Sequence, residues 1–185
     1  MIRTIFLYCV YLKYKIKFYG KVKLNGFTII FKFKEGNIQI GKNTTINSSF
    51  SSNLLGLYQK TIIITRYGGE IKIGKNVGIS GVTIYAMKNI QIGDYCMIGA
   101  NCKIIDNDFH PLDSKKRIQN RSEYIKKRDI IIGNNSFIGM NSIILKGTKL
   151  GSNCIVGAGS VVSGEFPNNV IIAGNPARVI KELTI

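Results

Sequence analysis

Aliphatic residues recur at every sixth position through the second half of this chain. The spacing holds without a miss at Ile132, Ile138, Ile144, Leu150, Val156 and Val162. The same step separates Ile92, Ile98 and Ile104, and it also appears at Ile73 and Ile79 and at Ile40 and Ile46. An amphipathic helix would repeat about every 3.6 residues and a half-buried strand at every second residue. The spacing therefore indicates a repeat architecture.

The positions around each aliphatic residue repeat as well. The next residue is often glycine, at Gly41, Gly74, Gly93, Gly99, Gly133, Gly139, Gly151 and Gly157. The fourth residue after the aliphatic is usually small, with Phe50 as the exception, at Thr44, Val77, Thr83, Cys96, Cys102, Ser136, Ser142, Thr148, Cys154 and Ser160. This pattern is typical of left-handed parallel β-helices, in which three hexads make one coil of about 18 residues. We therefore predict an all-β, left-handed parallel β-helix with aliphatic residues inside and small residues at the corners.

An antiparallel β-sandwich is the alternative fold. Its strands alternate at every second residue, so a strict step of six is hard to obtain there. The repeat is clear over residues 70–163 and blurred over 20–70, where Asn47–Leu57 and Lys60–Gly69 disturb the register.

Two interruptions divide the chain. Ile132 follows Ile104 by 28 positions instead of six, so about 22 extra residues are expected to leave the prism as an extruded loop over 106–130. The repeat ends after Val162. We predict an N-terminal segment over 1–19, a β-helix over 20–165 and a short C-terminal cap over 166–185.

The net charge of +16, from 26 basic and 10 acidic side chains, attracts anions such as nucleic acids, acidic membrane surfaces or phosphorylated small molecules. No helix-turn-helix, zinc-finger or RNA-recognition motif accompanies the charge, so we predict no nucleic-acid partner. The basic residues gather in 1–34 and 115–128.

The N-terminal apolar stretch Ile5–Leu12 is short, and lysines follow it without a small-residue cleavage site, so we interpret it as retained. Residues 1–20 are read either as a packed cap or as a basic and aromatic segment that makes peripheral contact with an anionic membrane. We expect the protein in the cytoplasm, and at the inner face of the membrane if residues 1–20 contact it.

Cysteine and histidine usage narrows the chemistry. Cys96, Cys102 and Cys154 occupy corner positions, so we expect small buried thiols without disulfides, as in a reducing compartment. The only histidine is His110, which excludes a three-histidine zinc site. We predict no metal.

Several stretches together resemble the hexapeptide-repeat acyltransferases, and most of all their sugar O-acetyltransferases. They are Ile92–Asn101, Asp106–Asp113, Ile132–Gly139, Val156–Val162 and Ala173–Ile180. The His-Pro pair in the loop and the Gly-Asn-Pro-Ala-Arg ending are the most specific of these. The resemblance implies a homotrimer with active sites between subunits and acetyl-coenzyme A as the acetyl donor.

The resemblance also implies roles for individual residues. His110 matches the catalytic histidine, which acts as the general base that takes the proton of a sugar hydroxyl. Asp106 or Asp108, or a backbone carbonyl, would orient the imidazole, and an N–H near Gly139 or Ser142 would serve the oxyanion. Predicted coenzyme contacts are Phe137, Gly139, Ser142, Ala158, Ser163, Arg178 and Lys181, and predicted acceptor contacts are Ser80, Asp106 and Asp108.

The chain departs from the family pattern at a few positions. Phe137 stands where tryptophan is common, and Ser80 where asparagine often contacts the acceptor. Ser163-Gly164 replaces the usual Thr-Lys, and Lys146 or Lys149 is a candidate to compensate for the lost lysine.

The function expected from the resemblance is acetyl-coenzyme A-dependent O-acetylation of a glycan or its precursor, in capsule, lipopolysaccharide or exopolysaccharide biosynthesis. The alternative is N-acetylation of a nucleotide-linked amino sugar. A non-catalytic, anion-binding scaffold is the alternative from a different class, since a fold does not determine a function.

Overall fold

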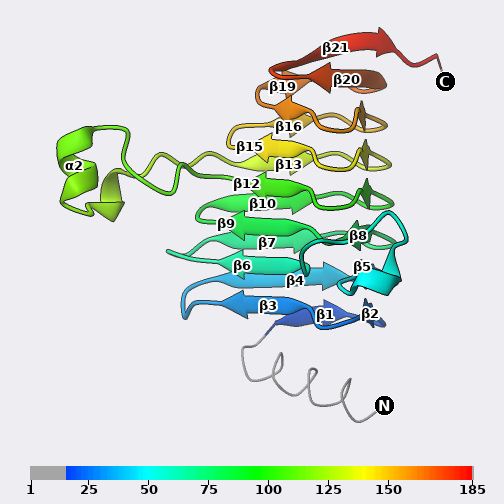
Figure 1. Ribbon diagram of the computed structural model, residues 1–185, viewed down its shortest axis with the longest axis horizontal. Coiled ribbons are helices and arrows are strands. Elements are labelled where there is room, and N and C mark those ends of the chain that lie inside the picture. The colour runs from blue at the N-terminus through cyan, green and yellow to red at the C-terminus, as the bar shows by residue number, and fades with distance from the viewer. Residues whose placement is uncertain (1–15, 185) are drawn as a thin grey trace.

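The computed structural model describes residues 16–184, which form a prism of stacked coils with one long arm (Figure 1). The first face contains β1 (Lys17–Tyr19), β4 (Asn37–Gly41), β7 (Glu70–Ile73), β10 (Asn89–Ile92), β13 (Ile130–Ile132), β16 (Lys149–Leu150) and β19 (Glu165–Phe166). The second contains β2 (Lys23–Asn25), β5 (Thr45–Asn47), β8 (Gly78–Ser80), β11 (Met97–Ile98), β14 (Phe137–Ile138), β17 (Ile155–Val156), β20 (Val170–Gly174) and β21 (Ala177–Glu182). The third contains β3 (Ile29–Lys32), β6 (Ile62–Thr65), β9 (Thr83–Ala86), β12 (Lys103–Ile105), β15 (Ile143–Leu145) and β18 (Val161–Val162).

The predicted left-handed parallel β-helix is confirmed, and its register follows the aliphatic repeat. Ile92 pairs with Ile73 in the coil before it and with Ile132 in the coil after it. All six aliphatic residues of the unbroken run are buried. Each side chain of this size contributes about 1.5–3 kcal/mol when it leaves water, so the stacked columns supply the core of a fold that has almost no helix.

Left-handed turn residues allow the chain to change direction at the corners. Asn135, Asn141 and Asn153 have φ of 58°, 59° and 59°, a conformation that asparagine tolerates better than most residues. At Gly139 the limit is space, because a Cβ there would lie 2.5 Å from the backbone nitrogen of Ala158 in the next coil. The glycine and asparagine positions of the repeat thus allow close stacking of the coils.

The blurred region of the repeat has a specific cause. The chain leaves the prism after β5 and returns at β6, and the segment between them carries the 3-10 helix η1 (Phe50–Ser52). Tyr58 ties this segment to a later corner, where its hydroxyl donates to Asn141 Oδ1 at 3.3 Å. The expected irregularity over Lys60–Gly69 is only partly present, since β6 pairs regularly with β3 and β9.

The ends of the prism differ from the predicted boundaries. β1 already pairs in parallel with β4, so the coils begin at or before Lys17. β19 and β20 continue the parallel stack, and only β21 turns back antiparallel on β20. The interpretation of residues 1–15 as cap or membrane segment lies outside the described residues. Within 16–184 no helix has the length and apolar character needed to cross a membrane.

The three corner cysteines are free and buried, as predicted, whereas Cys9 lies outside the described residues. Burial raises the pKa of the Cys96 and Cys154 thiols and raises the pKa of Cys102 to about 11. The nucleophile in alkylation is the thiolate.

We therefore expect Cys96, Cys102 and Cys154 to resist iodoacetamide at about pH 8 in the folded protein, and to react at the rate of free cysteine in urea. Peptide mass spectrometry of both samples measures this for each thiol. Rapid native labelling of any of the three would contradict the buried positions.

Candidate active site

A long arm leaves the prism between β12 and β13 (Figure 1). It carries the helix α2 (Ser114–Ile118) and the 3-10 helix η2 (Ser122–Tyr124). Asp113 caps α2, because its carboxylate accepts a hydrogen bond of 2.9 Å from the Lys116 N–H. This arm is the extruded loop expected from the broken repeat.

The root of the arm is a short antiparallel pair. Asn107 and Lys127 form a β-bridge. The Asp108 N–H donates to the Lys126 carbonyl at 3.1 Å, and the Arg128 N–H donates to the Asp106 carbonyl at 2.9 Å. The outgoing and returning chains thus hold each other where they meet the prism.

Asp106 is part of this root and does not face an acceptor. Its side chain is fully buried. Its two carboxylate oxygens accept hydrogen bonds of 2.8 Å from the backbone N–H groups of Met87 and Lys88, and Asn107 Nδ2 donates to Oδ1 at 3.0 Å. The predicted roles of Asp106 in acceptor binding and in orienting the imidazole are therefore wrong for this fold. The carboxylate instead fastens the arm to the preceding coil.

Asp108 supports His110 through its backbone. The His110 N–H donates to the Asp108 carbonyl at 2.6 Å, while the Asp108 carboxylate pairs with Lys146. The predicted carboxylate–imidazole contact is absent among the described hydrogen bonds. The ion pair also occupies Lys146, one of the two lysines considered as replacements for the family's missing lysine.

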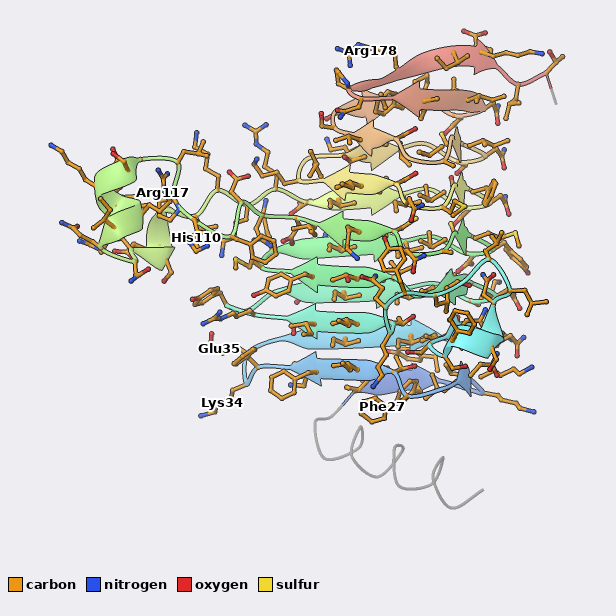
Figure 2. The ribbon with its side chains drawn as sticks, in the orientation of Figure 1. Phe27, Lys34, Glu35, His110, Arg117 and Arg178 are labelled. Carbon is orange, nitrogen blue, oxygen red and sulfur yellow. The ribbon has the colours of Figure 1, made fainter. Side chains whose placement is uncertain are left out.

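His110 projects from a constrained turn. Phe109 has a φ of 59°, its N–H donates to Asn107 Oδ1 at 2.9 Å, and its ring lies 4.9 Å from the ring of Tyr85. His110 itself is exposed. Figure 2 shows it on the arm with Arg117, away from the stacked strands. The imidazole is thus presented to solvent from an anchored segment.

A groove of about 580 Å³ runs over the second face of the prism. Four of the predicted site residues line it, namely Ser80, Phe137, Gly139 and Ala158. Its walls are largely apolar, with Leu55, Met97, Met140 and Ile155 among the other lining residues. Largely apolar walls are suited to an aliphatic arm or an acyl group.

One end of the groove is polar. Ser80 is nearly buried, and its hydroxyl accepts a hydrogen bond of 3.1 Å from Asn47 Nδ2. Asn47 in turn accepts one of 2.8 Å from Asn25. The ladder holds the Ser80 oxygen in place beside Asn53, another lining residue. Asn47 and Asn53 were not predicted from the sequence as lining residues. Asn47 directly follows the repeat residue Ile46, and that position was the only indication available for it.

Two predicted contacts are not available to a ligand. Ser142 is fully buried, and its hydroxyl donates to the carbonyls of Gly139 and Gly157 at 2.8 and 3.1 Å. The Gly139 N–H donates to the Val156 carbonyl at 2.8 Å, so it cannot also serve an oxyanion. The predicted Ser142 side-chain contact is therefore wrong, and the Gly139 N–H is excluded as the oxyanion donor, because these groups stack the coils. An oxyanion donor elsewhere near these two residues stays a prediction.

The predicted basic contacts lie near the C-terminal end of the prism. Arg178 and Lys181 are exposed on β21, and Figure 2 shows Arg178 at that end. Ser163 is exposed but is not part of the groove lining. Lys149 pairs with Glu165 at 2.7 Å, and the hydrogen bond that its ammonium group donates to that carboxylate raises the Lys149 pKa.

His110 and the groove belong to different parts of the chain. His110 belongs to the arm between the third and first faces, whereas the groove lies over the second face and His110 is not among its lining residues. Within residues 16–184, no group of three or more His, Cys, Asp or Glu side chains is arranged to hold a metal ion.

Comparisons with known proteins identify relatives of this chain. The family "Bacterial transferase hexapeptide (six repeats)" matches residues 129–164, and "Hexapeptide repeat of succinyl-transferase" matches 89–104. The galactoside O-acetyltransferase of Escherichia coli K12 is 31% identical over 164 residues, which cover 87% of this chain and 79% of that protein.

Two solved structures share the fold. The polySia specific acetyltransferase NeuO is 27% identical, with a TM-score of 0.67, over 92% of this chain and 76% of that one. The Bacillus cereus N-acyltransferase AntD, in complex with dTDP and coenzyme A, is 23% identical, with a TM-score of 0.68, over 94% and 88%. At that identity the likeness to AntD concerns the fold alone.

Proposed function

The chain belongs to the hexapeptide-repeat acetyltransferases, and on that premise we propose that it transfers the acetyl group of acetyl-coenzyme A to a sugar hydroxyl of a glycan or glycan precursor. The donor and the acyltransferase class follow from the family. The hydroxyl acceptor is favoured by a relative named a galactoside O-acetyltransferase, and a glycan acceptor by the neighbour named a polySia specific acetyltransferase.

The observation that carries the proposal is the division of the site between the arm and the groove. An exposed histidine held by an anchored turn and an apolar groove on another face are the two halves that acetyl transfer needs. We propose a homotrimer in which His110 of one subunit reaches the groove of its neighbour. Arg178 and Lys181, exposed at the end of the prism, then contact the phosphates of the coenzyme.

In the proposed reaction His110 acts as the general base. Its imidazole accepts the proton of the acceptor hydroxyl while that oxygen bonds to the thioester carbonyl carbon. The carbon–sulfur bond then breaks, and the imidazolium returns the proton to the departing sulfur. Because the turn at Asn107–His110 is held by backbone hydrogen bonds, little reorganisation is needed to position the base.

We place the enzyme in polysaccharide biosynthesis in the cytoplasm, with residues 1–20 as the segment that would contact the inner face of the membrane. The acetylated product would be a capsule, lipopolysaccharide or exopolysaccharide unit. The basic residues of this segment favour such a contact with anionic lipids.

A screen of acceptors tests the proposal directly. Neutral sugars, acidic sugars, nucleotide-linked sugars and glycan fragments are incubated with acetyl-coenzyme A, and release of the free thiol is followed. Turnover with a hydroxyl acceptor is expected. Turnover only with a nucleotide-linked amino sugar would replace the proposal by the N-acetylation alternative, and binding of anions without any turnover would favour a scaffold.

Ala158→Leu is expected to raise the KM for acetyl-coenzyme A by about tenfold or more, because the added side chain enters the groove. Ala158 is exposed, so the melting temperature should stay near that of the parent protein. Initial rates at varied acetyl-coenzyme A measure the effect. Ala158→Gly, which leaves the groove open, is the matched control, and an unchanged KM in the leucine variant would remove this face from coenzyme binding.

A further inference from the structure

Three consecutive cations lie at the root of the arm. Lys126, Lys127 and Arg128 are all exposed on the returning chain. This chain pairs with the outgoing residues 106–108 through the Asn107–Lys127 bridge and its two flanking hydrogen bonds. Paired chains lie about 5 Å apart, so the backbone of residues 126–128 borders the segment that leads directly into His110.

The acidic residues of the arm do not neutralise these cations. Each carboxylate has another partner: Asp106 binds backbone N–H groups, Asp108 pairs with Lys146, Asp113 caps α2, Glu123 pairs with Arg121, and Asp129 pairs with Lys88. None of the salt bridges in the described part of the chain involves Lys126, Lys127 or Arg128. The root of the arm therefore presents positive charge without an ion pair, on the chain that borders the segment leading to His110.

A cavity of about 240 Å³ opens between the arm and the prism at the same place. Tyr67, Met87 and Ile125 give it apolar walls, Ser122 and Glu123 add polar groups, and Lys127 contributes its cation. The Glu123 carboxylate is already paired with Arg121. A sugar ring has an apolar C–H face and a polar rim, and this combination of an aromatic wall and a cation matches a ring that bears an anionic group.

We propose that the acceptor is an acidic sugar, and that Lys127, with Lys126 and Arg128, binds its carboxylate or phosphate while the ring occupies the cavity against Tyr67. The proposal rests on the acetyl-transfer function proposed above and specifies its acceptor. A charged pair at this partly open site lowers the free energy of binding through Coulomb attraction that salt screens. A neutral sugar would gain nothing from the three cations.

The test compares three acceptors: an oligogalacturonate, a hexose phosphate and a neutral oligogalactose. Raising NaCl from about 20 mM to about 500 mM shortens the screening length severalfold. It should raise the KM of the acidic acceptor severalfold and leave that of the neutral one unchanged. Which of the two acidic compounds is preferred distinguishes a glycan carboxylate from a sugar phosphate.

Lys127→Gln should raise the KM for the acidic acceptor by about tenfold and leave the KM for acetyl-coenzyme A unchanged. Lys42→Gln, an exposed lysine in the turn between β4 and β5, is the matched control and should change neither value. An effect of Lys127→Gln confined to the KM for acetyl-coenzyme A would overturn the proposal, since the lysine would then serve the donor. Equal KM values for acidic and neutral acceptors would overturn it as well.

A binding measurement separates this inference from the catalytic proposal. Calorimetry of oligogalacturonate and hexose phosphate with His110→Ala should show salt-sensitive binding of at least one of them, and Lys127→Gln introduced into that variant should weaken the binding about tenfold. If that result is accompanied by no turnover in the parent protein, the proposed function fails while the anion site stands. Absence of binding to both compounds overturns the site.

Discussion

His110→Ala is expected to lower kcat for acetyl transfer by about 10²- to 10⁴-fold, the range that a positioned general base contributes. A sugar hydroxyl is a poor nucleophile until its proton leaves, and His110 is the only imidazole of the chain. Initial rates at saturating acetyl-coenzyme A and acceptor measure the loss. The KM for acetyl-coenzyme A should change little, because the proposed base acts on the acceptor hydroxyl and the groove proposed for the coenzyme is lined by other residues of its own chain.

Two controls separate catalysis from folding in this variant. The imidazole is exposed, and the described contacts of the turn are made by Phe109, Asn107 and the His110 backbone, so thermal unfolding should match that of the parent protein. Free imidazole added to His110→Ala should restore part of the rate. Full activity in a folded His110→Ala protein would exclude the proposed general base.

Asp106→Ala is expected to lower the free energy of unfolding by about 3 kcal/mol. The Asp106 side chain is buried, and without it the backbone N–H groups of Met87 and Lys88 lose their charged acceptor. It should also loosen the root of the arm, because the Asp106 carbonyl accepts the hydrogen bond of the Arg128 N–H across the antiparallel pair. Chemical denaturation followed by circular dichroism measures the stability. Hydrogen exchange at residues 106–128 measures the loosening.

Asp106→Asn and Asp108→Ala are the matched variants for this prediction. The asparagine keeps one acceptor but directs an NH₂ group at the second donor, so an intermediate loss is expected. Asp108→Ala removes a partly exposed ion pair with Lys146 and should cost about 1 kcal/mol or less. Equal stability of Asp106→Ala and the parent protein would show that the corner does not depend on this carboxylate.

Most of the fold could be predicted from the repeat, and its failures were local. A step of six places one aliphatic residue on each face, so Ile92 and Ile132 had to stack once the arm was set aside. The step shortens from six to five between Ile79 and Ile84, where Gly81 turns with a φ of 58°. The ends were misplaced because β1 and β19 lack the full hexad pattern, although their backbones still pair.

The site was predicted less completely, since a polar residue in a motif can either contact a ligand or form the hydrogen bonds that stack the coils. Asp106 follows Met87 and Lys88 by about one coil, and its carboxylate therefore meets their backbone from the coil above. Ser142 occupies the inward corner in the same way. Phe137, Ala158 and Ser80 line one groove, because outward positions of one face align through the stack, and their roles in binding stay predictions.

The sequence by itself determined the β-helix, the arm and the candidate base. A six-residue period specifies which side chains face inward, and a break in that period marks where the chain leaves the prism. Only the tertiary structure decided which polar groups remain available. Hydrogen bonds between coils join residues about 18 positions apart, and they use the carboxylate of Asp106, the hydroxyl of Ser142 and the N–H of Gly139. The tertiary structure also pairs the backbone of residues 126–128 with the segment that leads to His110, while the nearby acidic residue Asp108 is paired with Lys146.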